Sequence, residues 1–298
     1  RFEREGRAAA AIRHPHVVDV TDVGEHEGLA YLVLEHLEGE TLEDLLAREG
    51  ALAPPRAIDL MLPVIAAVDA AHAAGVVHRD LKPANLFIAR TPAGEAHPKV
   101  LDFGISRVVS EETRQTATAA LLGTPAYMAP EQIESTRDAD ARSDQYALSV
   151  VLYECLTGRR AFDGETVYAI LKRVGDGAFA PPRAVCPGLS PALAAIVLRA
   201  MSRDPRERFA SLRDFSAALL PFASERTRLS RSPALHAPVA PVATAVPPPP
   251  ESPAKRADTL SDSTHERAAR ALAPGRGRAR SFLRVVAAAV LVVLTVLI

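Results

Sequence analysis

Two hydrophobic patterns follow one another along the chain. Short runs of β-branched and aromatic residues lie in its first third, whereas apolar residues at helical spacing dominate from residue 142 onward. A few strands followed by many helices predict an α+β fold in which the sheet and the helices form separate layers. Apolar residues make up 48% of the sequence, so the chain is able to bury a large core.

The strands are expected in two pairs. Residues 17–23 and 29–35 are β-branched or aromatic runs, and the segment between them begins and ends with glycine, which is a hairpin signal. Residues 86–89 and 98–101 form the second pair, joined by a turn that contains proline and glycine.

Six segments have the apolar spacing or the composition of helices. The second of them contains Pro63, so we expect a bend there. The segments are residues 1–13, 54–74, 143–157, 165–174, 190–201 and 211–220.

Composition excludes several kinds of site. The 35 basic and 36 acidic side chains nearly cancel, so we expect no general attraction to nucleic acid. The only cysteines, Cys155 and Cys186, have no paired spacing. We therefore expect free thiols rather than a disulfide framework or a cysteine-based zinc site.

Two polar strings carry the chemistry. They are His78-Arg79-Asp80-Leu81-Lys82-Pro83-Ala84-Asn85 and Asp102-Phe103-Gly104. Asn85 precedes one predicted strand and Asp102 follows the next, so antiparallel pairing would bring both side chains to the same end of the hairpin. Together with Asp80, these oxygen-bearing groups suit a hard cation such as Mg²⁺ that also binds phosphate.

Lys82 would add a positive charge at the same place. A carboxylate that accepts a proton, a cation and a metal clamp are the parts that position and stabilise a transferring phosphoryl group. A lone Asp-Phe-Gly string more often only caps or solvates a loop. The two strings together, in this order and separated by strand, turn and strand, favour a phosphoryl-transfer site over that interpretation.

These strings resemble those of eukaryotic-type protein kinases, of the kind found as membrane-anchored bacterial serine/threonine kinases. The resemblance covers residues 1 to about 220 and implies a protein-kinase-like fold, with an essentially complete helical lobe and a partial N-terminal lobe of one helix and a β-hairpin. It implies that Asp80 is the catalytic base for the substrate hydroxyl and that Lys82 contacts the γ-phosphate of ATP. It also implies that Asn85 and Asp102 hold Mg²⁺.

The resemblance assigns further residues to nucleotide and substrate. Glu5 matches the glutamate that pairs with the ATP-binding lysine, and Leu34 falls at the gatekeeper position. Residues 35–37, which include Glu35 and Leu37, would meet the adenine ring through backbone groups. Thr124 matches the substrate pocket of kinases that act on serine and threonine hydroxyls of proteins, as does the Leu-Lys-Pro sequence around Lys82.

Other residues match the scaffold and the regulatory segment of this family. Glu131 and Arg208 match a partly buried ion pair, and Asp144 matches a buried aspartate of a central helix. Thr116 and Thr118 match the positions at which related bacterial kinases phosphorylate themselves. Phosphorylation there would place a negative charge near Arg79 and order the loop that carries these threonines.

The resemblance also exposes a gap. No glycine-rich phosphate loop and no lysine-bearing strand precede Glu5, so roughly the first fifty residues of such a domain are missing from this sequence. We expect the chain by itself to bind ATP poorly and to turn over slowly or not at all. The hairpin of residues 17–35 would also present an unpaired edge that favours aggregation.

The C-terminal quarter is expected to connect the kinase domain, residues 1–220, to a membrane. Residues 221–280 are rich in proline, alanine and arginine and predict a disordered linker. Residues 281–298 predict the start of a transmembrane helix, because the final apolar run spans roughly 21 Å of the about 30 Å hydrocarbon core. Four arginines between residues 276 and 284 predict a cytoplasmic flank, and hence a single-pass inner-membrane protein with a cytoplasmic kinase domain.

An active kinase of this kind would have protein substrates, the membrane and a second copy of the chain as its partners. Three other interpretations compete with it. A pseudokinase scaffold would be favoured if the protein lacked the ATP-binding lysine. A small-molecule phosphotransferase similar to aminoglycoside kinases shares the Asp…Asn…Asp core, but lacks the Ala-Pro-Glu that this chain has at residues 129–131. A purely structural membrane anchor would explain only the C-terminal run.

Overall fold

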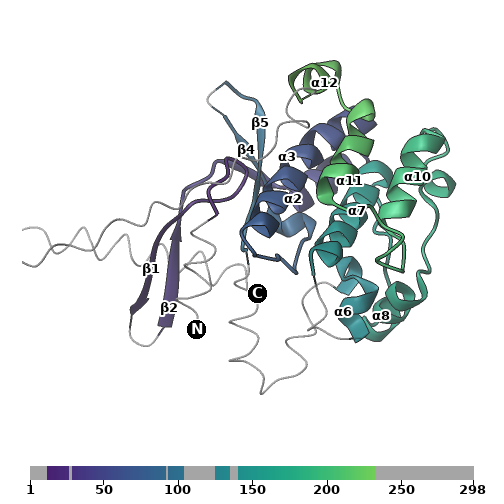
Figure 1. Cartoon of the computed structure of the whole chain (residues 1–298), viewed down its shortest axis with the longest axis horizontal. Coiled ribbons are helices and arrows are strands. Elements are labelled where there is room, and N and C mark those ends of the chain that lie inside the picture. The colour runs from purple at the N-terminus through teal and green to yellow at the C-terminus, as the bar shows by residue number, and fades with distance from the viewer. Residues whose placement is uncertain (1–11, 27–28, 92, 104–124, 135–139, 232–298) are drawn as a thin grey trace, which may run out of the picture. The chain divides into compact units, whose positions relative to one another are not determined.

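The computed structural model describes residues 12–26, 29–91, 93–103, 125–134 and 140–231 (Figure 1). Several predictions fall outside these residues: nearly all of the helix over residues 1–13 with Glu5, the candidate phosphorylation sites Thr116 and Thr118, the substrate-pocket residue Thr124, and the run over residues 281–298. They stay predictions.

The first predicted hairpin is present but begins later than expected. Strand β1, Val20–His26, pairs antiparallel with β2, Leu29–Leu34. Val17 instead forms a parallel bridge with Val100, and the Val18 N–H donates to the Val100 carbonyl at 3.0 Å. The predicted hairpin partner is therefore wrong for residues 17 and 18, because both valines are buried against β5, whereas Asp19 still pairs with Glu35.

The second predicted hairpin is confirmed and gains a third strand. Strands β4, Leu86–Arg90, and β5, Ala96–Val100, pair antiparallel, and β3, Gly39–Thr41, adds to the other edge of β4. No local sequence pattern predicted β3. A Cβ at Gly39 would lie 2.2 Å from the carbonyl oxygen of Ile88, so this close strand pairing requires glycine.

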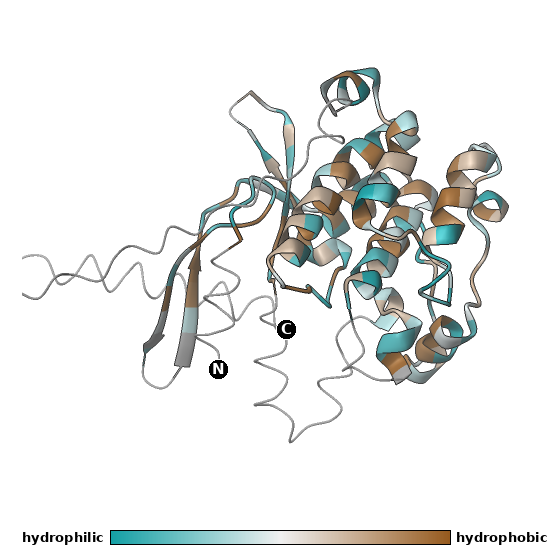
Figure 2. Cartoon of the chain, viewed as in Figure 1, coloured by the Kyte–Doolittle hydropathy of each residue, from teal (hydrophilic) through white to brown (hydrophobic). Residues whose placement is uncertain are grey.

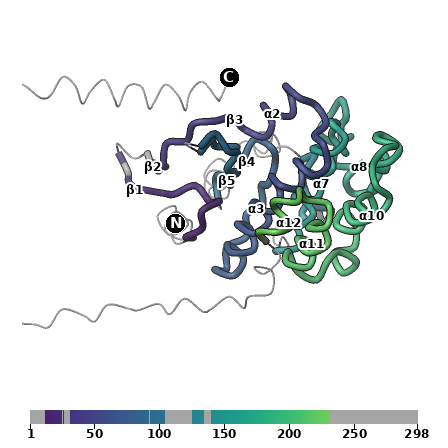
Figure 3. Tube along the Cα trace, turned by 90° about the horizontal axis from the view of Figure 1, so that it is seen from above, coloured from purple at the N-terminus to yellow at the C-terminus, as the bar shows by residue number. Residues whose placement is uncertain are grey.

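The other regular elements of the described residues are helices (Figures 1 and 3). The four helices expected after residue 142 and the one over residues 54–74 are present within a few residues of their predicted ends, and α2, α6, α9 and α12 are additional. The helices are α2 Leu42–Glu49, α3 Pro54–Ala73, α6 Pro130–Glu134, α7 Ala141–Thr157, α8 Val167–Asp176, α9 Pro182–Val185, α10 Pro191–Ala200, α11 Leu212–Leu219 and α12 Glu225–Arg231. Short 3₁₀ turns lie at Pro83–Asn85, Pro125–Tyr127 and Leu220–Phe222.

Helices α3 and α7 pack against each other at the centre of the core. The apolar residues that predicted α3, from Ile58 to Val68, are almost completely buried, and Figure 2 shows this helix as mainly hydrophobic. The helix continues through Pro63, although proline lacks the N–H for the usual bond to the carbonyl four residues earlier. Burial on nearly all sides of α3 offsets that loss.

The ordered structure extends past the predicted end of the kinase domain. The linker prediction began at residue 221, but α12 follows, Ala223 is buried, and the Ser224 N–H donates to Asp59 Oδ1 on α3 at 3.1 Å. Residues 222–224, in the first part of the predicted linker, therefore pack on the helical layer, and the mostly exposed α12 continues from them to Arg231. Among the described residues, no helix is both long enough and apolar enough to cross a bilayer.

Candidate active site

The polar string of residues 78–85 forms the loop between α3 and β4, and the buried side chain of His78 holds this loop in place. The His78 side chain is fully buried, its Nε2 hydrogen-bonds to the Leu101 carbonyl at 2.8 Å, and its ring packs edge-on against Phe103. The Asp80 N–H donates to His78 Nδ1 at 3.3 Å. Since both ring nitrogens are engaged, His78 positions the loop and is not available as a base.

Asp80, Lys82 and Asn85 form one hydrogen-bonded cluster. Lys82 Nζ donates to Asp80 Oδ2 at 2.9 Å, and Asn85 Nδ2 donates to the same oxygen at 3.1 Å and to the Asp80 carbonyl at 2.8 Å. The Asp80 side chain keeps 32% of its surface exposed, so a substrate hydroxyl can approach it. A carboxylate held by two donors yet open to solvent has the geometry of a catalytic base.

Asp102 completes the cluster from the end of β5. Leu86 pairs with Val100, and the Leu101 N–H donates to the Asn85 carbonyl at 2.9 Å, so the prediction that Asn85 and Asp102 reach the same end of the hairpin is confirmed. Loss of hydration raises the pKa of Asp102, the Asp80 carboxylate raises it further, and His78 and Lys82 oppose the change. These charges act on Asp102 because the groups lie close together.

This donor set fits Mg²⁺. Asp80 engages the amide nitrogen of Asn85, which leaves the amide oxygen as the atom able to bind a cation. Asp102 adds a carboxylate that is exposed at the end of β5 and is therefore open to a cation. Oxygen ligands of this type are those that Mg²⁺ prefers. Among the described residues, no group of three or more histidine, cysteine, aspartate and glutamate side chains could hold a metal ion.

Asp144 on α7 holds the backbone of the loop of residues 78–85, which is called the catalytic loop below. Its two carboxylate oxygens accept the N–H groups of His78 and Arg79, both at 2.8 Å, and Oδ2 also bonds to His72 Nε2 at 2.7 Å. Arg79 has a φ of 69°, a left-handed conformation that costs about 1–3 kcal/mol in a residue with a side chain. Asp144 is 1% exposed, so its charge is stabilised mainly by these bonds.

Asp144→Asn should unfold more easily than the wild type by about 2–4 kcal/mol, because an amide can replace only one of the two accepting oxygens. Chemical denaturation followed by circular dichroism measures the change. Asp176→Asn is the matched control, since Asp176 is exposed and pairs with the exposed Lys172 across one helical turn. A loss no larger than that of the control would contradict this role of Asp144.

The predicted pair of Glu131 and Arg208 is present and bidentate. Arg208 donates to Glu131 Oε1 at 2.7 Å and to Oε2 at 2.9 Å, and Ser143 Oγ donates to Oε1 at 2.8 Å. The Arg208 side chain has no exposed surface. Burial by itself would raise the pKa of Glu131, but the bonds and charge of Arg208 outweigh it and lower that pKa. The pair joins α6, which follows the predicted substrate segment, to the helical layer.

Residues predicted to meet the adenine ring lie where β2 ends. The Glu35 N–H donates to the Asp19 carbonyl at 2.9 Å, its carboxylate accepts the Asp19 N–H at 2.8 Å, and Lys99 Nζ pairs with the same carboxylate. Leu37 is half-buried two residues later, and Leu34 is 36% exposed at the end of β2. The pair of Glu35 and Lys99 therefore connects the predicted nucleotide-binding segment to β5. Lys99 lies three residues before Asp102 in the sequence.

Two groups near the site were missed in the sequence analysis. Lys99 lies between two buried residues of β5, and this alternation indicates a side chain outside the core. It does not indicate that Glu35 is the partner of Lys99. Tyr127 Oη donates to Glu154 of α7, and burial raises the pKa of both side chains. No local pattern connects residues so far apart.

The predicted free thiols are confirmed, since neither Cys155 nor Cys186 forms a disulfide among the described residues.

Comparisons with known proteins agree with this geometry. The model of the protein kinase domain matches residues 1–218. The chain is 40% identical over 225 residues to serine/threonine-protein kinase PknB of Mycobacterium tuberculosis, covering 74% of this chain and 35% of that protein. It is 37% identical over 277 residues to a probable serine/threonine-protein kinase of Corynebacterium efficiens, covering 87% of this chain and 41% of that protein.

Solved structures show the same likeness. The crystal structure of the kinase domain of PknI from Mycobacterium tuberculosis, as a double mutant, has a TM-score of 0.60 and 27% identity, covering 75% of this chain and 78% of that one. A crystal structure of Rad53 in complex with AMP-PNP has a TM-score of 0.62 at 24% identity, over 75% of this chain and 54% of that one, which supports the fold alone. The chain spans only 35–41% of the length of the curated relatives named above.

Proposed function

This chain belongs to the protein kinase family, and on that premise we propose that it transfers the γ-phosphate of ATP to serine and threonine hydroxyls of proteins in bacterial signalling. The observation that carries the proposal is Asp80, held by Lys82 and Asn85 beside Asp102. The names of the relatives favour an enzyme over a pseudokinase scaffold.

Each residue of the cluster has a part in the reaction. Asp80 orients the acceptor hydroxyl and takes its proton as the oxygen attacks the γ-phosphorus. Lys82 neutralises charge on the γ-phosphate oxygens. Asn85 and Asp102 would hold Mg²⁺, which supplies charge stabilisation for the transferring group when bound. Asp144 keeps the backbone of the loop in the conformation that presents Asp80.

The finer parts of the proposal rest on the sequence. We include Glu5 as the partner of an ATP-binding lysine and Thr124 as part of the substrate pocket. Residues 281–298 begin a single membrane span, with the kinase domain on the cytoplasmic side of the inner membrane and copies able to pair there. Their support is the family motifs, the apolar C-terminal run and the arginines before it.

The direct test incubates the full-length protein with radiolabelled ATP, Mg²⁺ and matched peptides that differ only in a serine, threonine or tyrosine acceptor. We expect label in the serine and threonine peptides and none when EDTA removes the metal. Label confined to the tyrosine peptide, or to a small-molecule alcohol such as an aminoglycoside, would contradict the proposed substrate class.

Autophosphorylation at Thr116 and Thr118 is a separate prediction. A phosphothreonine brings about −1.5 to −2 charge and can order the surrounding segment against Arg79. Mass spectrometry of active full-length protein should find both residues phosphorylated, and the double substitution to alanine should lower activity several-fold. An active preparation in which both threonines are unmodified would contradict this prediction.

A further inference from the structure

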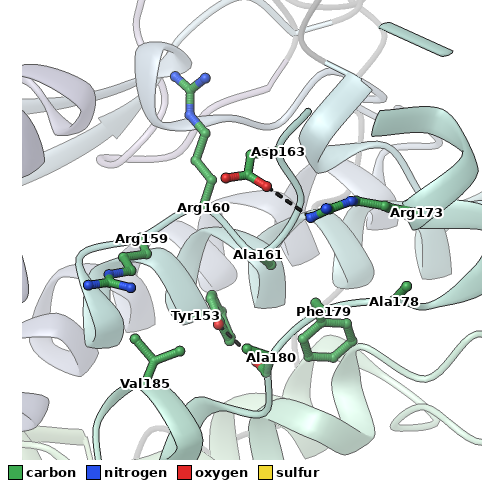
Figure 4. A pocket seen from close by; sticks show the side chains of 10 residues that line it. All are labelled: Tyr153, Arg159, Arg160, Ala161, Asp163, Arg173, Ala178, Phe179, Ala180 and Val185. Carbon is green, nitrogen blue, oxygen red and sulfur yellow. Dashed lines mark hydrogen bonds and ion pairs between the residues drawn. The ribbon is translucent and has the colours of Figure 1, made fainter. Parts of the chain in front are cut away.

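A cavity of about 560 Å³ lies among helices that the proposed reaction does not use. Its walls come from the end of α7, the connection from α7 to α8, α8 itself and the segment that leads to α9 (Figure 4). No residue of the catalytic loop, β4 or β5 lines it. Its polar and aromatic lining consists of Tyr153, Arg159, Arg160, Asp163, Arg173 and Phe179.

The lining carries more positive than negative charge, with three arginines against one carboxylate. Arg173 pairs with Asp163 at 3.0 Å, and both side chains are more than half exposed. Within the described residues, Arg159 forms hydrogen bonds only through its backbone. Its guanidinium group is therefore available to an added carboxylate, and the Arg173–Asp163 pair shows that a carboxylate can be held at this cavity.

The third arginine connects the cavity to the predicted substrate segment. The Arg160 guanidinium lies 3.4 Å from Glu43 and 3.9 Å from Glu154, and Glu154 accepts the hydroxyl of Tyr127. Tyr127 belongs to the turn that directly follows Thr124. Helix α8 contacts both this turn and α6, and Figure 1 shows α8 beside α6. The cavity is thus one helix away from the place where the acceptor would be held.

We propose that this cavity is a docking site for an acidic segment, rich in aspartate or glutamate, of the protein substrate. The proposal rests on the proposed kinase function and names which proteins the enzyme prefers. A carboxylate of the substrate binds Arg159, while the acceptor hydroxyl lies at Asp80. Two contacts in one molecule raise the effective concentration of the acceptor, so docking lowers the KM of the protein substrate without changing the chemical step.

The test uses the full-length protein and peptides with one serine acceptor, a flexible glycine-serine linker and a four-residue tail. The tail is glutamate, phosphoserine or glutamine. In the wild type, we expect the glutamate tail to lower KM about tenfold relative to glutamine, with kcat unchanged. Arg159→Glu should remove the difference, Arg159→Lys should keep part of it, and neither should affect a peptide without a tail. The control is Arg228→Glu, which reverses an exposed charge on α12.

A binding measurement separates this proposal from the proposed function. Fluorescence anisotropy of a labelled glutamate-tail peptide needs no turnover, and binding that Arg159→Glu weakens while Arg228→Glu does not supports the docking site even if no peptide is phosphorylated. Equal binding of the glutamate and glutamine tails, or binding unaffected by Arg159→Glu, would overturn it. Binding of the phosphoserine tail alone would overturn the choice of carboxylate as the recognised group.

Discussion

Asp80→Asn should reduce phosphoryl transfer by the full-length protein about 10³-fold while leaving the fold intact. Asparagine has nearly the same shape and can still accept hydrogen bonds from Lys82 and Asn85. It cannot take a proton from the acceptor hydroxyl, and removal of a general base costs on the order of 10²–10⁴-fold. The measurement is the initial rate of label transfer to a serine peptide at saturating ATP.

Two controls distinguish a lost base from a damaged site. The KM for ATP should stay within about twofold of the wild type, because Asn85 and Asp102, which we propose hold Mg²⁺, are unchanged. Asp176→Asn, a substitution of the same chemistry on the exposed face of α8, should transfer phosphate at the wild-type rate. If Asp80→Asn labels the peptide as fast as the wild type, the assignment of Asp80 as base is wrong.

Arg208→Met should destabilise the folded state by about 3–5 kcal/mol, the largest effect on stability that we expect from a single substitution. The change leaves the carboxylate of Glu131 without its bidentate partner, and the backbone carbonyls of Arg142 and Ser202 also lose a donor. Urea denaturation measures the free energy of unfolding.

Nearby residues offer a matched control and a rescue. Arg206 also forms an ion pair with an aspartate, at 2.7 Å, but its side chain is 83% exposed, so Arg206→Met should not change stability measurably. Combining Glu131→Gln with Arg208→Met should recover part of the loss, because the uncompensated charge is then gone. Equal effects of the two arginine substitutions would show that burial of the pair is unimportant.

The pH dependence of the Arg208→Met effect follows from the lowered pKa of Glu131. Such a group stabilises the fold at pH values above its unfolded pKa near 4.5, and this contribution is lost as the pH falls through the lower folded pKa. In the variant, acid protonates the unpaired carboxylate and removes the cost of its charge. The difference in stability between wild type and variant should therefore shrink below about pH 4.5, and a difference that grows there would contradict the ion-pair explanation.

Local patterns predicted most elements of the fold, and two failures differ in their cause. Helix α2 was not predicted, although its sequence contains the usual signals of a helix start and end. Thr41 and Asp44 form a capping box, and Gly50 ends the helix. The strand start at Val17 was misassigned because periodicity identifies an extended apolar residue but not its partner. Burial against β5 decided that partner.

Residues close together in the sequence predicted the catalytic centre. Asp80, Lys82 and Asn85 fall within one loop, and a single hairpin brings Asp102 to them, so short-range geometry suffices. Resemblance to the kinase family added Asp144 and the pair of Glu131 and Arg208, but not the atoms that they bind.

Long-range packing decided the rest. That Asp144 holds the left-handed Arg79 and that Lys99 pairs with Glu35 both depend on contacts between residues more than sixty positions apart. Hydrophobic burial of α3 against α7 brings Asp144 to the loop that follows α3. Such burial is non-directional, so the spacing of apolar residues does not encode which polar atoms will meet. Desolvation then makes each buried charge depend on the partner that the packing supplies.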